Sequence, residues 1–240
     1  MERITCALVL AILSAFHCVA VSADTGEDSR DPWEGFNRVV FSFNDSADKY
    51  LLQPVARGYR KVTPTFVDQS LANLFNNLGE IKNVGNNALQ GDGGDMLVSG
   101  GRFLINTTVG VLGIFDVATY IGLTRDSEDF GQTLAVWGLG NGPYLMLPLI
   151  GPSTLRDSVG RGADSFTEIT RGIDPSTVQL GMTMLDLLQV RASLLGTEDL
   201  VSGDKYTFFK DVYLQRRDFL INDGKLKDDF GGEDFETFDF

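Results

Sequence analysis

The sequence predicts an all-α fold in a single domain, made of amphipathic helices around an irregular middle segment rich in glycine and proline. The first observation is that apolar residues recur with helical spacing along most of the chain, whereas few segments alternate with a period of two. The second is the cluster of glycines and prolines between residues 122 and 152, which interrupts that pattern. A chain of 240 residues without an internal repeat is consistent with one domain of this kind.

Residues 1–23 are expected to form a signal peptide, because a basic residue near the start is followed by an apolar run from Ile4 to Phe16. Val21-Ser22-Ala23 offers small residues at the cleavage positions, so the mature chain is expected to begin at Asp24 with a polar leader at residues 24–30. A membrane anchor is the first alternative, although the apolar run is short for a helix that spans a bilayer.

Lipidation of Cys18 is the second alternative for the N-terminal segment. A lipid-carrying cysteine follows small residues, whereas Phe16 and His17 precede Cys18. We therefore expect cleavage after Ala23 rather than lipidation of Cys18.

Cleavage after Ala23 would remove every cysteine and histidine of the chain, namely Cys6, Cys18 and His17. The mature chain would then have no thiol nucleophile, no imidazole base and no Cys/His metal site. We therefore expect no enzymatic activity, no metal and no cofactor. The net charge of −13 also excludes nucleic acid as an expected partner, because phosphate binding needs a basic face.

The mature chain is expected to open with a helix that starts at Asp31, which can cap it, with Pro32 in the first turn. Apolar residues between 36 and 50 then recur with helical spacing. Pro54 is expected to interrupt this helix, so a second, short helix is predicted at residues 55–62.

The next apolar stripe covers residues 67–89, and Gly79 and Gly85 within it predict two consecutive helices. Asp92 is expected to cap the following helix, which carries apolar residues between 96 and 104. The glycine-rich stretch at residues 109–115 is apolar but short, and it predicts a bend or a re-entrant segment.

Ser153 is expected to cap a helix that runs towards Phe166, and Asp174-Pro175 to begin the next one. Residues 178–195 are apolar on more than one face, as in a helix that is buried or that touches lipid. A last amphipathic helix is predicted at residues 206–220.

We therefore expect one helical domain at residues 31–222, followed by a tail at residues 223–240. The tail is rich in acidic residues with interspersed phenylalanines, which predicts a disordered segment. A strand that docks on a partner is the alternative for it.

Several sequence blocks, in this order and with this spacing, resemble the MlaA (VacJ) family of bacterial outer-membrane phospholipid-transport proteins. The resemblance runs from about Asp31 to Gly224. Its blocks are DPWEGFNR at 31–38, NLFNNL at 73–78, LQGD at 89–92, RFLINT at 102–107, EDFGQTL at 128–134, GPY at 142–144, TLRD at 154–157 and YLQRRDF at 213–219.

This resemblance implies a ring of helices embedded in the inner leaflet of the outer membrane, around an amphipathic channel. It further implies association with a trimeric porin and transfer of mislocalised outer-leaflet phospholipid to the soluble periplasmic carrier MlaC. Such retrograde traffic preserves lipid asymmetry. The chain departs from the family in one respect, since family members are lipoproteins and the residues before Cys18 fit a lipidation signal poorly.

Two sets of candidate residues follow from this picture. For the channel and its gate we expect a flexible apolar bend beside polar groups, formed by Asn106, Gly110, Gly113, Phe115 and Asp116. Replacing either glycine with a β-branched residue should then impair transport and leave the fold intact. For the membrane-facing rim we expect Phe36, Val40, Phe43, Val178, Met182, Leu185 and Leu188.

A soluble periplasmic adaptor or interaction protein with the same fold is the alternative function. The poor lipidation signal and the acidic tail favour it. The adaptor would need no detergent for solubility, whereas a lipid channel would.

Overall fold

The computed structural model describes residues 30–167, 176–197, 201, 203–222 and 224. Its elements, in chain order, are α2 (Glu34–Ala47), the π-helical turn η1 (Asp48–Leu52), α3 (Gln53–Val62), α4 (Thr65–Gln90), α5 (Gly93–Thr108), α6 (Val117–Tyr120), α7 (Phe130–Val136), β1 (Tyr144–Leu147), β2 (Gly151–Thr154), α8 (Leu155–Thr167), α9 (Ser176–Ser193) and α10 (Lys205–Ile221). The predicted all-α class is confirmed. The signal peptide, the residues of the leader before Arg30, Asp174-Pro175, and the tail apart from Gly224 lie outside the described residues.

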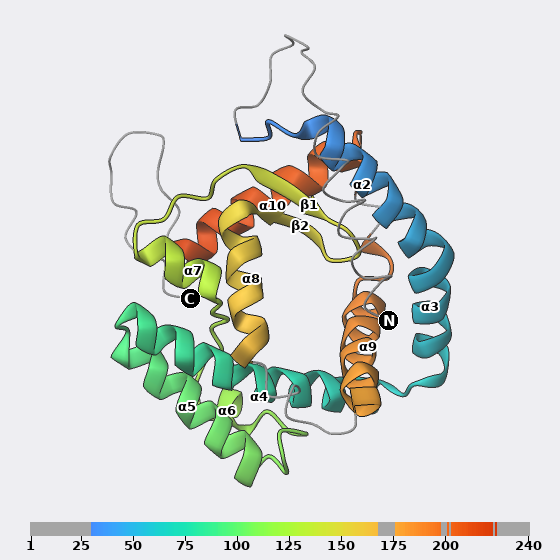
Figure 1. Ribbon diagram of the computed structural model, residues 1–240. Helices are drawn as coiled ribbons and strands as arrows, with labels where there is room; N and C mark the ends of the chain where they lie inside the picture. Colours follow the sequence, from blue (N-terminus) through green and yellow to red (C-terminus); the bar gives the residue numbers. More distant parts are fainter. Residues whose placement is uncertain (1–29, 168–175, 198–200, 202, 223, 225–240) are drawn as a thin grey trace.

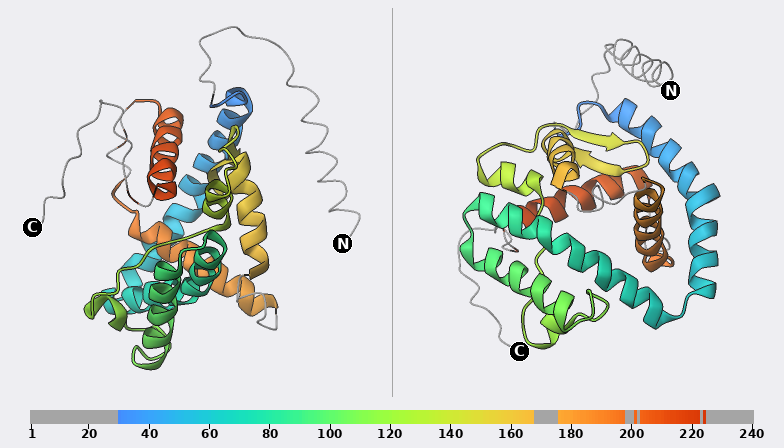
Figure 2. Two further views of the ribbon diagram at one scale, coloured as in Figure 1. Left: turned by 90° about the vertical axis from the view of Figure 1, so that its left-hand side faces the viewer. Right: turned by 60° about the horizontal axis from the view of Figure 1, so that its bottom comes forward.

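The helices are arranged in a ring. Figure 1 shows α2 and α3 along one side, α4 across a second side with α5 and α6 outside it, and α7, α8, α10 and the hairpin closing the circuit. The helix α9 lies inside the ring, where it packs against α3 and α4, and the right-hand view of Figure 2 shows the same order of elements. No described helix is both long enough and apolar enough to cross a membrane.

The first helix does not end where Pro54 predicts a break. The backbone stays helical from α2 through η1 into α3, which begins at Gln53, immediately before the proline. A proline ring clashes with the carbonyl one turn earlier and donates no hydrogen bond there. The wider π-helical turn accommodates this defect, so the chain bends around the ring without a loop.

The two helices predicted across Gly79 and Gly85 are one continuous helix, α4. It packs along α5 and contacts α7 and α9. Its buried face is polar and carries Asn77, Glu80, Asn83, Asn86 and Asn87. A glycine inside a helix costs only about 1 kcal/mol relative to alanine, so packing on both sides outweighs the two glycines.

The segment predicted to be irregular contains an antiparallel hairpin, in which Tyr144 pairs with Thr154 and Leu147 pairs with Gly151. Asn37 on α2 holds this hairpin by its backbone. Its side chain donates to the Tyr144 carbonyl at 3.1 Å and accepts from the Met146 amide at 2.8 Å. The Asn37 carboxamide therefore gives hydrogen-bond partners to two backbone groups of β1 that no neighbouring strand satisfies.

Helix capping agrees with the sequence at Asp92, whose carboxylate accepts the Asp95 amide at 3.0 Å. Two other predicted caps are wrong. Thr154 rather than Ser153 caps α8, since its hydroxyl accepts the Asp157 amide at 3.1 Å. Asp31 is buried instead of capping α2, and its carboxylate accepts hydrogen bonds from Asn37 at 2.8 Å and from Tyr206 at 2.5 Å.

Candidate functional site

In the described part of the chain, most buried side chains are polar, and many large apolar side chains are exposed. Its buried hydrophobic cluster is small and consists of Val40, Tyr144, Met146, Tyr206 and Leu214. Most other buried side chains are polar or charged, while large apolar side chains are exposed on every helix of the ring. Apolar patches of this extent are rare on proteins surrounded by water and mark contact with a membrane or a partner.

A buried ion-pair cluster lies between α4, α5 and α6. The Arg102 side chain is 2% exposed, and its Nε donates to Glu80 at 2.8 Å. Its terminal nitrogens contact Asp116 at 3.2 Å and Thr119 at 3.0 Å, and one of them donates to the Leu123 carbonyl. The guanidinium group is therefore paired with two carboxylates, which a buried charge requires.

Asn106 joins this cluster to the loop that follows α5. Its side chain donates to Asp116 at 3.0 Å and accepts from the Ala118 amide at 2.9 Å. Burial by itself would raise the pKa of Asp116, but hydrogen bonds from Thr119, Asn106 and Arg102 outweigh it, and the pKa lies below its ordinary value. Asp116 is therefore a carboxylate at neutral pH.

The loop at residues 109–116 is tightly folded above this cluster. A Cβ atom on Gly110 would lie 2.2 Å from the Phe115 carbonyl oxygen, so only glycine fits there. Gly113 has φ +92°, and a Cβ atom on it would lie 2.7 Å from that of Asn77. Val111 and Leu112 also adopt positive φ, which costs free energy in residues with branched side chains and often marks functional loops.

The structure brings all five predicted gate residues together in one loop and its base, with Phe115 held there by the hydrogen bond from its amide to the Gly110 carbonyl. Asn106, Gly110 and Gly113 are buried, Asp116 is partly buried, and Phe115 points its ring to the exterior with Val111 and Leu112. The sequence prediction missed Arg102 and Glu80, which hold this group. Glu80 lies on α4 and Arg102 on α5. No local sequence pattern predicts that two residues 22 positions apart will form a buried ion pair.

A second buried ion-pair cluster joins α10 to α7 and α8. Arg217 donates to both oxygens of Asp129 at 2.6 Å and to Asp157 at 2.9 Å, and Tyr213 donates to Asp157 at 2.7 Å. Burial would raise the pKa of both carboxyl groups, but Arg217 outweighs it at Asp129, and Tyr213, Arg217 and Arg156 outweigh it at Asp157. Both pKa values are therefore lowered.

The predicted rim is partly wrong on α2. Val40 is only 8% exposed and belongs to the buried hydrophobic cluster, and Phe36 packs against that cluster. They face the hairpin because it covers this side of α2. Phe43 is exposed, so it alone of the three α2 positions faces outward.

The predicted rim on α9 also needs correction, because this helix has two apolar stripes. Val178 is exposed, whereas Met182, Leu185 and Leu188 are half-buried. The more exposed stripe consists of Leu180, Met184, Leu187 and Val190. Contacts with α3 and α4 cover the first stripe, and sequence periodicity alone does not show which stripe is covered.

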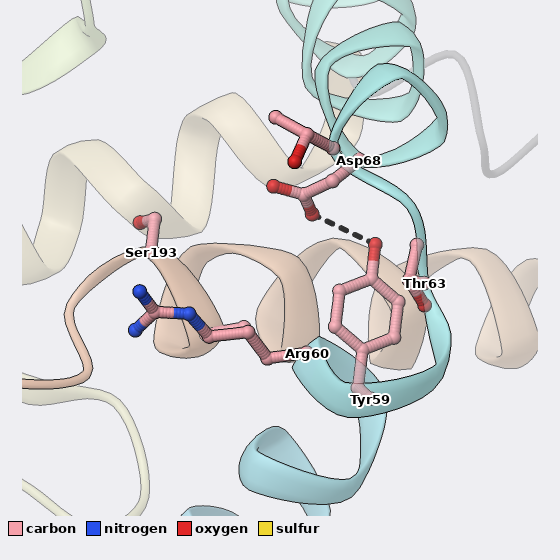
Figure 3. A pocket seen from close by; sticks show the side chains of 7 residues that line it. Tyr59, Arg60, Thr63, Asp68 and Ser193 are labelled. Carbon is pink, nitrogen blue, oxygen red and sulfur yellow. Dashed lines mark hydrogen bonds between the residues drawn. The ribbon is translucent and has the colours of Figure 1, made fainter.

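A cavity of about 310 Å³ lies where α3, the start of α4 and the end of α9 meet. Its lining is mostly polar and consists of Tyr59, Arg60, Thr63, Thr65, Asp68, Ala192 and Ser193. Figure 3 shows the Tyr59 hydroxyl directed at Asp68, and their oxygens are 2.9 Å apart. The sequence analysis did not identify this site, since its residues come from three separate segments.

A ring of helices with many exposed large apolar side chains is typical of a protein that contacts a membrane or a partner. The chain belongs to the MlaA lipoprotein family, whose family model matches residues 29–220.

Relatives and a solved structure agree with this assignment. The intermembrane phospholipid transport system lipoprotein MlaA of Escherichia coli is 38% identical over 86% of this chain and 84% of its own length. The protein of the same name from Haemophilus influenzae is 32% identical over 91% of this chain and 92% of its own. A structure solved to explain the maintenance of bacterial outer membrane lipid asymmetry superposes with a TM-score of 0.72 and 36% identity, over 80% of this chain and 99% of that one.

Proposed function

We propose that this chain is the outer-membrane component of an intermembrane phospholipid transport system. It removes mislocalised phospholipid from the outer leaflet through an amphipathic channel and thereby maintains lipid asymmetry. The observation that carries the proposal is the match to MlaA relatives and to the solved structure over most of the chain, together with the large apolar side chains exposed around the ring.

The proposed mechanism is physical rather than chemical. A phospholipid that leaves a leaflet must keep its head group solvated and its acyl chains in an apolar medium. The proposed channel requires polar side chains along the opening of the ring for the head group, while the exposed apolar side chains hold the protein in the bilayer interface. The mature chain that we expect has no Cys or His, which is consistent with a transporter that makes and breaks no bonds.

The loop at residues 109–116 is the proposed gate. It is apolar on its exposed side, it holds two non-glycine residues at positive φ, and its base is fixed by Asn106 and Asp116. Positive φ at Val111 and Leu112 is strained and persists only while the surrounding contacts hold it, so a change at the base of the loop would let the loop move.

We place the protein in the outer membrane on its periplasmic side, after export by a cleaved signal peptide. The family description as a lipoprotein makes Cys18 the residue that would carry an acyl chain, since Cys6 lies early in the expected signal peptide. The poor fit of Phe16 and His17 to a lipidation signal favours a mature start at Asp24. The proposed partners are phospholipid, a porin trimer that supports the ring, and the periplasmic carrier MlaC.

The test is complementation of a strain that lacks its own copy of the gene. The full-length chain should lower the amount of phospholipid in the outer leaflet, measured by labelling from outside the cell, and should fractionate with the outer membrane. Intact mass spectrometry of the same fraction should give a mature start at Asp24, whereas an acyl mass on Cys18 would establish the lipoprotein form. Recovery from the soluble periplasm without detergent would overturn the channel and establish the adaptor.

A further inference from the structure

We propose that the cavity between α3, α4 and α9 binds the zwitterionic head group of a phosphoethanolamine phospholipid. This inference rests on the proposed function in phospholipid transport and names the lipid class that the protein prefers. The cavity has a volume of about 310 Å³, which is large enough for a small polar head group.

The cavity presents two opposite charges that do not neutralise each other. Arg60 on α3 donates to the Leu195 carbonyl at 3.1 Å, and Asp68 on α4 accepts the Tyr59 hydroxyl at 2.9 Å. Among the described contacts, no ion pair joins Arg60 to Asp68, although both line the same space. Figure 3 shows the Arg60 guanidinium on the Ser193 side and the Asp68 carboxylate beside Tyr59.

Tyr59 keeps the anionic side of the cavity in place. Burial and the hydrogen bond to Asp68 raise the pKa of Tyr59 to about 12, so the phenol remains a neutral donor. The bond occupies Oδ1 of Asp68 and orients Oδ2 for a second donor.

This arrangement selects a ligand that carries both charges. A guanidinium group binds phosphate, and a carboxylate binds an ammonium group through charge-assisted hydrogen bonds. A phosphoethanolamine head group offers both. An anionic head group such as phosphoglycerol would satisfy Arg60 but would place its charge near Asp68 without an ammonium to compensate.

Exposed apolar side chains next to the cavity indicate a lipid rather than a free head group. Val62 at the end of α3 is 78% exposed and Phe66 at the start of α4 is 70% exposed, so they flank the turn that carries the cavity. Leu194 follows Ser193 and is also exposed. Acyl chains of a lipid whose head group occupies the cavity can cover these three side chains.

The first experiment measures binding to the full mature chain in a mild detergent, by calorimetry with short-chain lipids. The probes are dihexanoylphosphatidylethanolamine, dihexanoylphosphatidylglycerol, glycerophosphoethanolamine and inorganic phosphate. We expect the phosphatidylethanolamine to bind best, the free head group more weakly because it lacks chains, and inorganic phosphate weakest. Equal binding of the two lipids would overturn the inference.

Variants assign the binding to the cavity. Arg60→Gln should weaken binding of the phosphatidylethanolamine about tenfold, and Asp68→Asn should lower its preference over phosphatidylglycerol by a similar factor. Arg57→Gln is the matched control, because Arg57 is exposed on the same helix and does not line the cavity. An Arg60→Gln variant that binds the lipids like Arg57→Gln would contradict the proposal. Tyr59→Phe is an independent test, because it removes the hydrogen bond that holds the Asp68 carboxylate in place.

Complementation separates this inference from the proposed function. If the unaltered chain fails to lower outer-leaflet phospholipid, the transport function itself falls. If the unaltered chain complements but Arg60→Gln and Asp68→Asn bind both lipids as it does, only the head-group site falls.

Discussion

Arg217 on α10 and Asp129 at the start of α7 form a two-pronged ion pair, with both nitrogen–oxygen distances at 2.6 Å. The two residues are 88 positions apart, and the contact joins the last helix of the ring to its middle. Because Arg217 also contacts Asp157 on α8, one side chain fixes three helices relative to one another. We regard this cluster as the closure of the ring.

The first prediction concerns this closure. Arg217→Met should lower the free energy of unfolding by about 3 kcal/mol, because it removes the cation paired with Asp129 and one of the two arginines paired with buried Asp157. Thermal unfolding in detergent, followed by circular dichroism, measures the change. Arg216→Met is the control, since Arg216 is exposed on the same helix, and an equal loss in both variants would contradict the role of the ion pair.

The second prediction is a dependence of stability on pH. The pKa values of Asp129 and Asp157 are lowered in the folded chain, so their contribution is complete above the unfolded value near 3.8. It should be lost as the pH falls below that value and through the folded pKa of each group. Melting temperatures between pH 7 and pH 2 should therefore fall steeply at the acid end, and Arg217→Met should flatten that fall whereas Arg216→Met should not.

The third prediction concerns the proposed gate. Gly110→Ala should impair transport, because the added carbon meets the Phe115 carbonyl oxygen at 2.2 Å and displaces the loop. The structure thus revises the sequence expectation that a larger residue here leaves the fold intact, since the loop backbone itself must move. Outer-leaflet phospholipid in a complemented deletion strain measures transport. Gly85→Ala on α4 is the control, as its added carbon has nothing within 4 Å, and it should not reduce transport.

The fourth prediction tests the hairpin. Asn37→Ala should destabilise the fold by about 2–4 kcal/mol, because it removes the partners of one buried carbonyl and one buried amide at Tyr144 and Met146. Asn44 makes similar bonds to Leu147 and Leu149 in a more exposed place, so Asn44→Ala should cost less. Thermal unfolding of the two variants compares them, and an equal effect would contradict the dependence on burial.

Sequence periodicity predicted most helices because a helix is a local structure. The positions of α5 and α10 and the cap at Asp92 follow from residues a few positions apart. The bonds of Asn37 to the hairpin span more than 100 positions, and no local pattern reports them. For the same reason, the ion pairs of Arg102 and Arg217 and the cavity beside Arg60 were found only in the folded chain.

The choice between two apolar stripes on α9 failed for a related reason, and it leads to the last prediction. Both stripes have helical spacing, but contacts with α3 and α4 half-bury the one that contains Leu185, while Leu180 and Leu187 on the other are exposed. If the exposed stripe faces lipid, Leu180→Glu and Leu187→Glu should weaken association with phospholipid vesicles and leave the melting temperature in detergent almost unchanged, since charge in the apolar layer is costly. Leu185→Glu should instead lower the melting temperature, because it places a charge between helices. Vesicle flotation and thermal unfolding measure the two effects, and a loss of flotation confined to Leu185→Glu would show that the half-buried stripe is the one that meets the membrane.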